Sequence, residues 1–130
     1  MAEISKQRPK FLNLLEIKQP LPAVASILHR VSGAGLFLML PLLIWLLQLS
    51  LGSTESIETL KAIFANPLVK LILLGLLWAF LHHFCMGIRI LLIDIHIGVD
   101  KQPARASAVA VLAVSLTLTA ILGLKLLGAY

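Results

Sequence analysis

Residues 68–93 read LVKLILLGLLWAFLHHFCMGIRILLI, an apolar run long enough to cross a membrane as one helix. A hydrocarbon core of about 30 Å requires about 20 consecutive apolar residues in helical form. Ionisable side chains at that depth are costly and are usually retained for function. The run nevertheless contains His82 and His83. Because histidine is the commonest metal ligand among side chains, this stretch predicts a membrane protein that holds a metal or haem inside the bilayer.

The composition of the whole chain is also that of a membrane protein. Of its 130 residues, 59% are hydrophobic and 13% are charged, whereas soluble domains average about 45–50% and about 25%. The net charge of +5 does not indicate a nucleic-acid partner, because the cations flank the apolar runs. Cys85 is the only cysteine, which excludes an internal disulfide and a CxxCH haem attachment. We expect no cleavable signal peptide and a single transmembrane anchor domain over residues 1–130.

The hydropathy pattern predicts three spans, at approximately residues 27–51, 68–93 and 107–127. Residues 52–55 should end the first helix, Pro67 suits the first turn of the second, and residues 100–103 should break the chain before the third. Residues 1–25 mix apolar and charged side chains. They predict either a short interfacial helix or an ordered arm packed on a partner. The expected fold is all-α: an integral membrane protein with three transmembrane helices plus a short N-terminal interfacial segment.

The distribution of lysine and arginine predicts the orientation in the membrane. Cations precede the first span and surround the loop between the second and third spans, whereas the first loop holds Lys61 and Lys70 together with Glu55 and Glu58. We therefore expect the N-terminus and the second loop on the cytoplasmic side of a bacterial inner membrane. The cations concerned are Lys6, Arg8, Lys10, Lys18 and Arg30 near the first span, and Arg89, Lys101 and Arg105 near the second loop.

A stripe on the second span points to a prosthetic group. His83 and Gly87 are four residues apart and share a helix face, which Asp94 continues toward the cytoplasmic end. A glycine beside a histidine leaves a groove in which a flat macrocycle can lie. The alternative is that His83 only forms a hydrogen bond to a neighbouring helix. His82 points about 100° away and is a separate case.

A second stripe lies at the cytoplasmic start of the first span. Ser26, His29, Arg30 and Gly33 follow at helical spacing and place a hydroxyl, an imidazole and a guanidinium on one face. Such a set can bind a quinone carbonyl or a carboxylate such as a haem propionate. Arg30 alone would be read as an interfacial anchor whose charge reaches the headgroups.

The other polar or aromatic residues of the spans have simpler interpretations. Arg89 and Asp94 lie near the cytoplasmic end of the second span, where they would support a redox path from that surface inward. Cys85 is read as a buried apolar residue and Trp78 as a packing residue.

Two motifs resemble the large cytochrome b membrane-anchor subunit of succinate dehydrogenase (succinate:quinone oxidoreductase, respiratory complex II). The first is Arg8-Pro9 followed by the string Ser-x-x-His-Arg-x-Ser-Gly over residues 26–33, and the second is His-x-x-x-Gly-x-Arg over residues 83–89 with Asp94 beyond it. Together with the three spans, the resemblance covers nearly the whole chain. The departures from the family pattern are Lys10, Ile90 and His96.

The resemblance implies a set of roles. His83 would be an axial ligand of haem b, and a second, smaller anchor subunit would supply the other ligand. Ser26 and Arg30 would bind ubiquinone, and His29 and Arg30 would lie near the haem propionates. Gly87, Arg89 and Asp94 would support the site. Iron–sulfur and flavoprotein subunits would dock on the cytoplasmic face, and lipid would surround the spans.

Three alternatives remain open at this stage. One is the anchor of a fumarate reductase, an enzyme that catalyses the reverse reaction. The amino-acid sequence distinguishes poorly between this anchor and that of a succinate dehydrogenase. A small transporter or channel is disfavoured, because no acidic residue lies in the middle of a span. A structural scaffold without haem would tolerate replacement of His83 by leucine.

Overall fold

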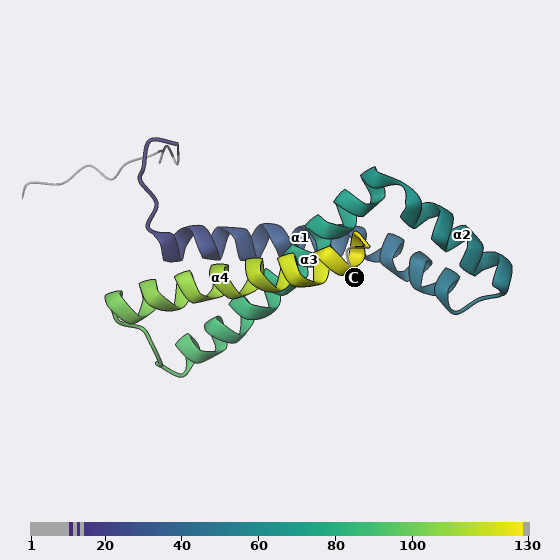
Figure 1. The fold of residues 1–130 in the computed structure, drawn as a ribbon. Coiled ribbons are helices and arrows are strands. Elements are labelled where there is room, and N and C mark those ends of the chain that lie inside the picture. Colours follow the sequence, from purple (N-terminus) through teal and green to yellow (C-terminus); the bar gives the residue numbers. More distant parts are fainter. Residues whose placement is uncertain (1–10, 12, 14, 129–130) are drawn as a thin grey trace, which may run out of the picture.

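The computed structural model describes residues 11, 13 and 15–128, and the described residues form helices and no strands. The helices are α1 (Leu21–Ser50), α2 (Thr54–Ala65), α3 (Pro67–Asp94) and α4 (Lys101–Leu126), shown in Figure 1. Of these, α1, α3 and α4 are long and apolar enough to cross a membrane. The prediction of an all-α protein with three transmembrane helices is therefore confirmed.

Two of the predicted helix starts were too late. The first span was expected from residue 27 and α1 begins at Leu21, while the third was expected from residue 107 and α4 begins at Lys101. In both helices a proline, Pro22 or Pro103, lies in the first turn, where its missing N–H costs no intrahelical hydrogen bond. Residues 100–103 thus begin α4 rather than separating it from α3. The chain reverses just before them, at His96 (φ 64°) and Gly98 (φ 74°).

The connection expected as a loop between the first two spans contains a helix, α2. Its N-cap is Ser53, whose hydroxyl accepts a hydrogen bond from the Ser56 N–H at 3.4 Å. Lys61 and Glu58 form an exposed ion pair of 2.8 Å along it. The break that the sequence predicted after the first span is present, since α1 ends at Ser50.

Of the N-terminal interfacial segment predicted for residues 1–25, residues 1–10, 12 and 14 lie outside the described residues. The described part forms one turn, in which the carbonyl of Asn13 accepts hydrogen bonds from the backbone N–H groups of Glu16 and Ile17 at 3.1 and 3.2 Å. From Leu21 onward the chain already belongs to α1.

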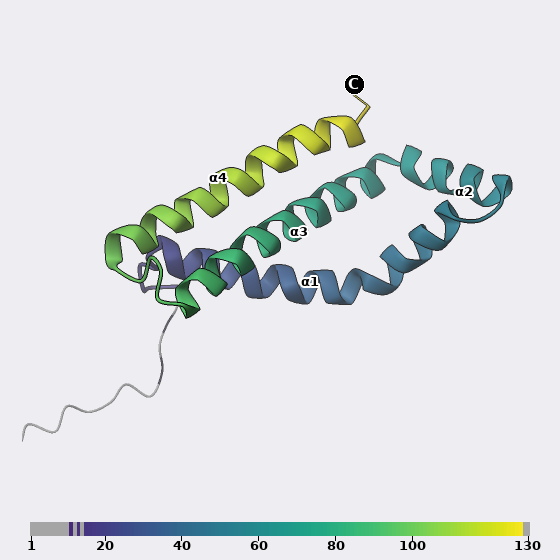
Figure 2. The ribbon, with the colours of Figure 1, turned by 90° about the horizontal axis from the view of Figure 1, so that it is seen from below.

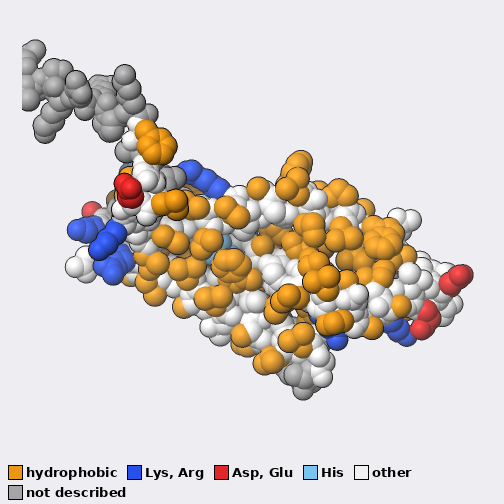
Figure 3. All heavy atoms as spheres, turned by 90° about the horizontal axis from the view of Figure 1, so that it is seen from above, with side chains coloured by type: hydrophobic (Ala, Val, Ile, Leu, Met, Phe, Trp, Pro, Cys, Tyr) orange, Lys and Arg blue, Asp and Glu red, His pale blue; other side chains and the backbone are white. Residues whose placement is uncertain are grey.

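Helix α3 lies between α1 and α4 and packs against both, as Figure 2 shows. The buried core is small and consists mostly of small or flexible side chains: Ala25, Met86, Ala108 and Val111. Most large apolar side chains are exposed instead. Figure 3 shows them over the middle of one face, with lysine and arginine gathered at the end where α1 begins. An apolar middle with charged ends is the surface that a bilayer requires.

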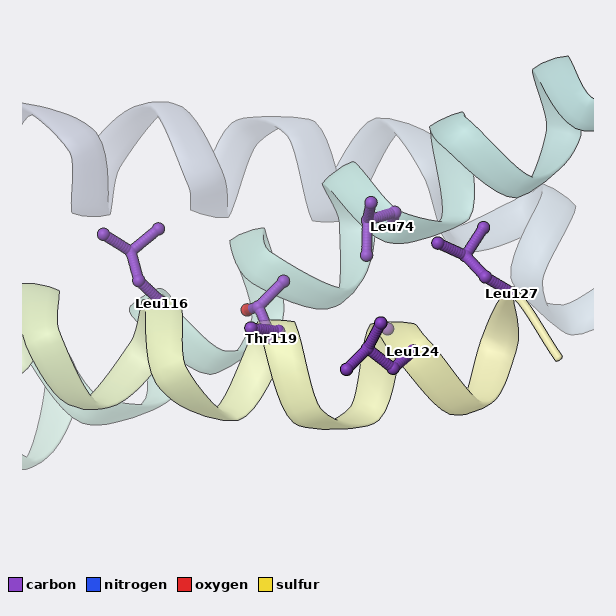
Figure 4. A pocket seen from close by; sticks show the side chains of 7 residues that line it. Leu74, Leu116, Thr119, Leu124 and Leu127 are labelled. Atoms are coloured by element: carbon purple, nitrogen blue, oxygen red, sulfur yellow. The ribbon is translucent and has the colours of Figure 1, made fainter. Parts of the chain in front are cut away.

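An open apolar groove lies between α3 and α4 at the end away from the start of α1. Figure 4 shows the side chains of Leu74, Leu116, Thr119, Leu124 and Leu127 around it. Thr119 is its polar lining residue, and its hydroxyl donates to the Ser115 carbonyl at 2.7 Å. None of the residues predicted to bind haem or quinone lines this groove, so the candidate site lies elsewhere.

Candidate functional site

The candidate site lies where α3 crosses the first turns of α1, and His83 is its centre. Nδ1 of His83 lies 3.0 Å from the carbonyl oxygen of His29 and 3.2 Å from the hydroxyl oxygen of Ser32. The Ser32 hydroxyl donates to the same carbonyl at 2.8 Å. Because a carbonyl oxygen can only accept, Nδ1 carries the ring proton and the lone pair is on Nε2. This is the tautomer that a histidine adopts when Nε2 binds a metal.

The ring of His83 is held by two residues of α1. Its plane stacks on the ring of His29, with centroids 4.0 Å apart and planes inclined by 8°. Gly33 lies against its edge, and a Cβ added there would stand 2.8 Å from Cε1 of His83. A side chain at position 33 would therefore displace the ring. The glycine permits the close approach that fixes the imidazole.

The second predicted glycine, Gly87, has a different environment. A Cβ added there would meet no atom within 4 Å. Gly87 follows His83 by four residues on the same face of α3, and both are half-buried. A planar group could therefore lie against Gly87 without meeting side chains of this chain. Together with the free Nε2, this fits a haem bound at the surface of this chain.

Of the predicted residues of α1, only His29 is seen to contact this ring. His29 contacts His83 directly, and Arg30, its neighbour in the chain, is exposed. The side chains of Ser26 and Arg30 form no hydrogen bond or ion pair with another described residue. Both are therefore free to bind a group from outside the chain. The structure thus brings His29 and His83 together, and Ser26 and Arg30 form no hydrogen bond with either ring.

Arg89 is placed differently from the α1 residues. It is 8% exposed, and its guanidinium binds α4 through the Ser107 hydroxyl at 2.9 Å and the Ala104 carbonyl at 3.1 Å. It also lies 3.8 Å from the Met86 sulfur. Its donors are occupied in joining α3 to α4, so it can support the site only through helix packing. Asp94, the last residue of α3, is exposed and is not brought to His83.

Sequence reasoning did not assign a role to two residues that contact this site. Ser32 completes the hydrogen bonds around Nδ1 of His83. The feature of the sequence that could have identified it is its position in the motif over residues 26–33, three residues after His29. His82 is fully buried, and its Nε2 lies 3.2 Å from the Ala25 carbonyl. No periodicity in the sequence distinguishes that buried position from a lipid-facing one.

The fold and the site define a small membrane subunit of three spans with a histidine cluster near one end. The sequence matches the family described as the succinate dehydrogenase/fumarate reductase transmembrane subunit over residues 4–122. The chain belongs to this family. The resemblance that the two motifs indicated is therefore confirmed.

Similar proteins carry the name succinate dehydrogenase cytochrome b556 subunit. One from Coxiella burnetii is 36% identical over 113 residues, which cover 86% of this chain and 90% of that protein. One from Rickettsia typhi is 30% identical over 120 residues, which cover 92% and 94%. One from Paracoccus denitrificans is 29% identical over 119 residues, which cover 91% and 92%. The similarity therefore extends over nearly the full length of both chains.

Proposed function

We propose that this chain is the membrane-anchor haem b subunit of a succinate:ubiquinone oxidoreductase. The observation that carries the proposal is the His83 ring, whose Nδ1 is bound to the His29 carbonyl at 3.0 Å while Nε2 remains free. The family match over residues 4–122 and the cytochrome b556 names of similar proteins support the same reading.

In this proposal, His83 ligates the iron through Nε2, and His29 and Arg30 lie near the propionates. The ring of His29 is stacked on that of His83 at 4.0 Å, so it would not hold the iron together with His83. The family resemblance implies that the other ligand would come from a second, smaller anchor subunit. When bound, the haem supplies a one-electron redox centre of b type.

Ser26 and Arg30 would bind ubiquinone. The guanidinium of Arg30 donates to a quinone carbonyl, and the hydroxyl of Ser26 provides a second donor one helical turn away. Both side chains lack partners among the described residues, so neither must break a bond within the chain to bind. As negative charge develops on the quinone oxygen, these donors would stabilise it.

The partners would assemble at the end of the bundle where α1 begins. Lysine and arginine gather there in Figure 3, which is the cytoplasmic side by the distribution of positive charge. Iron–sulfur and flavoprotein subunits would dock on that face and deliver electrons derived from succinate, while lipid of the bacterial inner membrane surrounds the apolar middle. The chain itself carries no dicarboxylate chemistry in this proposal, and nucleic acid is not a partner.

The test is Arg30→Ala in the complete complex, purified from membranes in mild detergent. Succinate oxidation with an artificial electron acceptor measures assembly, and reduction of a short-chain ubiquinone analogue measures the quinone site. We expect quinone reduction to fall at least tenfold while oxidation with the artificial acceptor is retained. Wild-type quinone reduction and haem content in Arg30→Ala would overturn the assignment of this residue.

The same family description also covers a second candidate function, that of the membrane anchor of a fumarate reductase. The quinone made by the host separates the two functions, because menaquinone favours fumarate reduction and ubiquinone favours succinate oxidation.

A further inference from the structure

His82 has no part in the haem or quinone roles proposed above, yet it is the most deeply buried polar side chain on α3. It is 0% exposed, and its Nε2 lies 3.2 Å from the carbonyl oxygen of Ala25 on α1. Because that carbonyl can only accept, Nε2 carries the proton and donates it. His82 therefore forms a hydrogen bond between α3 and α1 within the membrane-spanning part of the bundle.

The two adjacent histidines bind α1 at two points, one helical turn apart. His82 donates to the carbonyl of Ala25, and His83 donates through Nδ1 to the carbonyl of His29. A peptide group joins the carbonyl of one residue to the nitrogen of the next. The two bonds thus hold the peptide groups that carry Ser26 and Arg30, the two proposed quinone-binding residues.

We propose that His82 is a positioning residue for the quinone site. By holding the Ala25–Ser26 peptide group, it fixes the rotation and height of α1 against α3 at Ser26. His83 does the same at Arg30, so the pair of histidines sets where α1 presents the two donors relative to α3. The inference rests on the proposed function, because it concerns the placement of Ser26 and Arg30 toward that substrate.

The environment of His82 indicates that packing alone does not account for the residue. Its Nδ1 is buried without a hydrogen-bond partner among the described residues, and so is Nε1 of Trp78, one turn earlier on α3. The two rings are in contact, with centroids 5.3 Å apart and planes inclined by 31°. An apolar side chain of similar size would fill this space without burying unpaired polar atoms. The bond from Nε2 to the Ala25 carbonyl is the interaction that a leucine could not make.

The test compares His82→Leu, His82→Gln and His82→Asn in the complete complex. The terminal amide nitrogen of glutamine takes the place of Nε2 and can still donate to the Ala25 carbonyl, whereas that of asparagine is too short. We expect His82→Leu and His82→Asn to raise KM for the ubiquinone analogue roughly three- to tenfold, the range expected for loss of an intramembrane hydrogen bond. His82→Gln should restore KM to within about twofold of wild type, in keeping with a retained donor.

Two controls separate positioning from folding. A merely structural role would lower the amount of assembled complex, measured by succinate oxidation with an artificial acceptor, and would leave KM unchanged. If His82→Leu does not assemble, the comparison of glutamine with asparagine decides the question. Equal KM values for those two variants, or a wild-type KM for His82→Leu, would overturn the inference.

Arg30→Ala, measured in parallel, distinguishes failure of this inference from failure of the proposed function. Impaired quinone reduction in Arg30→Ala with wild-type KM in the His82 variants would overturn the positioning role alone. Wild-type quinone reduction in Arg30→Ala would remove the proposed quinone site, and with it the inference about His82.

Discussion

Replacement of Gly33 by alanine should displace the imidazole of His83. The added Cβ would lie 2.8 Å from Cε1 of His83, and ordinary van der Waals contact begins at 3.4 Å, so the ring or the helix must move by at least 0.6 Å. The ring cannot easily yield, because one of its faces stacks on His29 and its Nδ1 is bound to the His29 carbonyl. Overpacking of this kind costs about 1–3 kcal/mol, which exceeds the gain of up to about 1 kcal/mol from replacing a helical glycine by alanine.

Gly35 provides the matched control on the same helix. A Cβ added there meets no atom within 4 Å. Gly35→Ala should therefore only stabilise the helix, because alanine has the higher helix propensity. The assay is the amount of b-type haem per complex together with the thermal unfolding of the complex in detergent. We expect Gly33→Ala to lose haem and to unfold at lower temperature than wild type, and Gly35→Ala to match or exceed wild type. Equal haem content and equal unfolding temperature in the two variants would refute the reasoning.

Three further substitutions test other contacts. Arg89→Lys replaces a guanidinium, whose separate nitrogens reach Ser107 and a backbone carbonyl, with an ammonium whose donors all lie on one nitrogen, and thermal unfolding should show a loss of about 1–3 kcal/mol. Ser32→Ala removes one of two acceptors at Nδ1 of His83; a redox titration should show a shifted haem potential with the haem retained, and an unchanged potential would contradict this. Glu58→Gln breaks an ion pair whose side chains are 67% and 70% exposed, so unfolding should change by less than about 0.5 kcal/mol.

The sequence was sufficient to predict the three long helices because their apolar runs exceed the membrane thickness. It was insufficient for their starts, since α1 and α4 begin inside proline-containing segments that hydropathy assigns to the flanks. Helix α2 was missed because its mixture of Glu55, Glu58 and Lys61 with apolar residues reads equally well as a loop. Both errors concern segments whose structure hydropathy does not determine.

The candidate site was predictable in its residue types and not in its contacts. Helical spacing was enough to place His83 near Gly87 and His29 near Arg30, because the two members of each pair belong to the same helix. The contacts of His83 with His29, Ser32 and Gly33 depend on how α3 crosses α1, which no periodicity records. The same crossing buries His82, which the sequence analysis set aside.

The most direct test of the central claim is a dithionite-reduced minus oxidised spectrum of the complex, recorded for wild type and for His83→Leu. The account predicts a sharp b-type α band in wild type that disappears or shifts in His83→Leu, because Nε2 of this residue is the proposed axial ligand. Phe84→Leu, at an exposed position of the same helix, should leave the band unchanged. An unaltered α band in a fully assembled His83→Leu complex, or no b-type signal in the wild-type complex, would contradict the account.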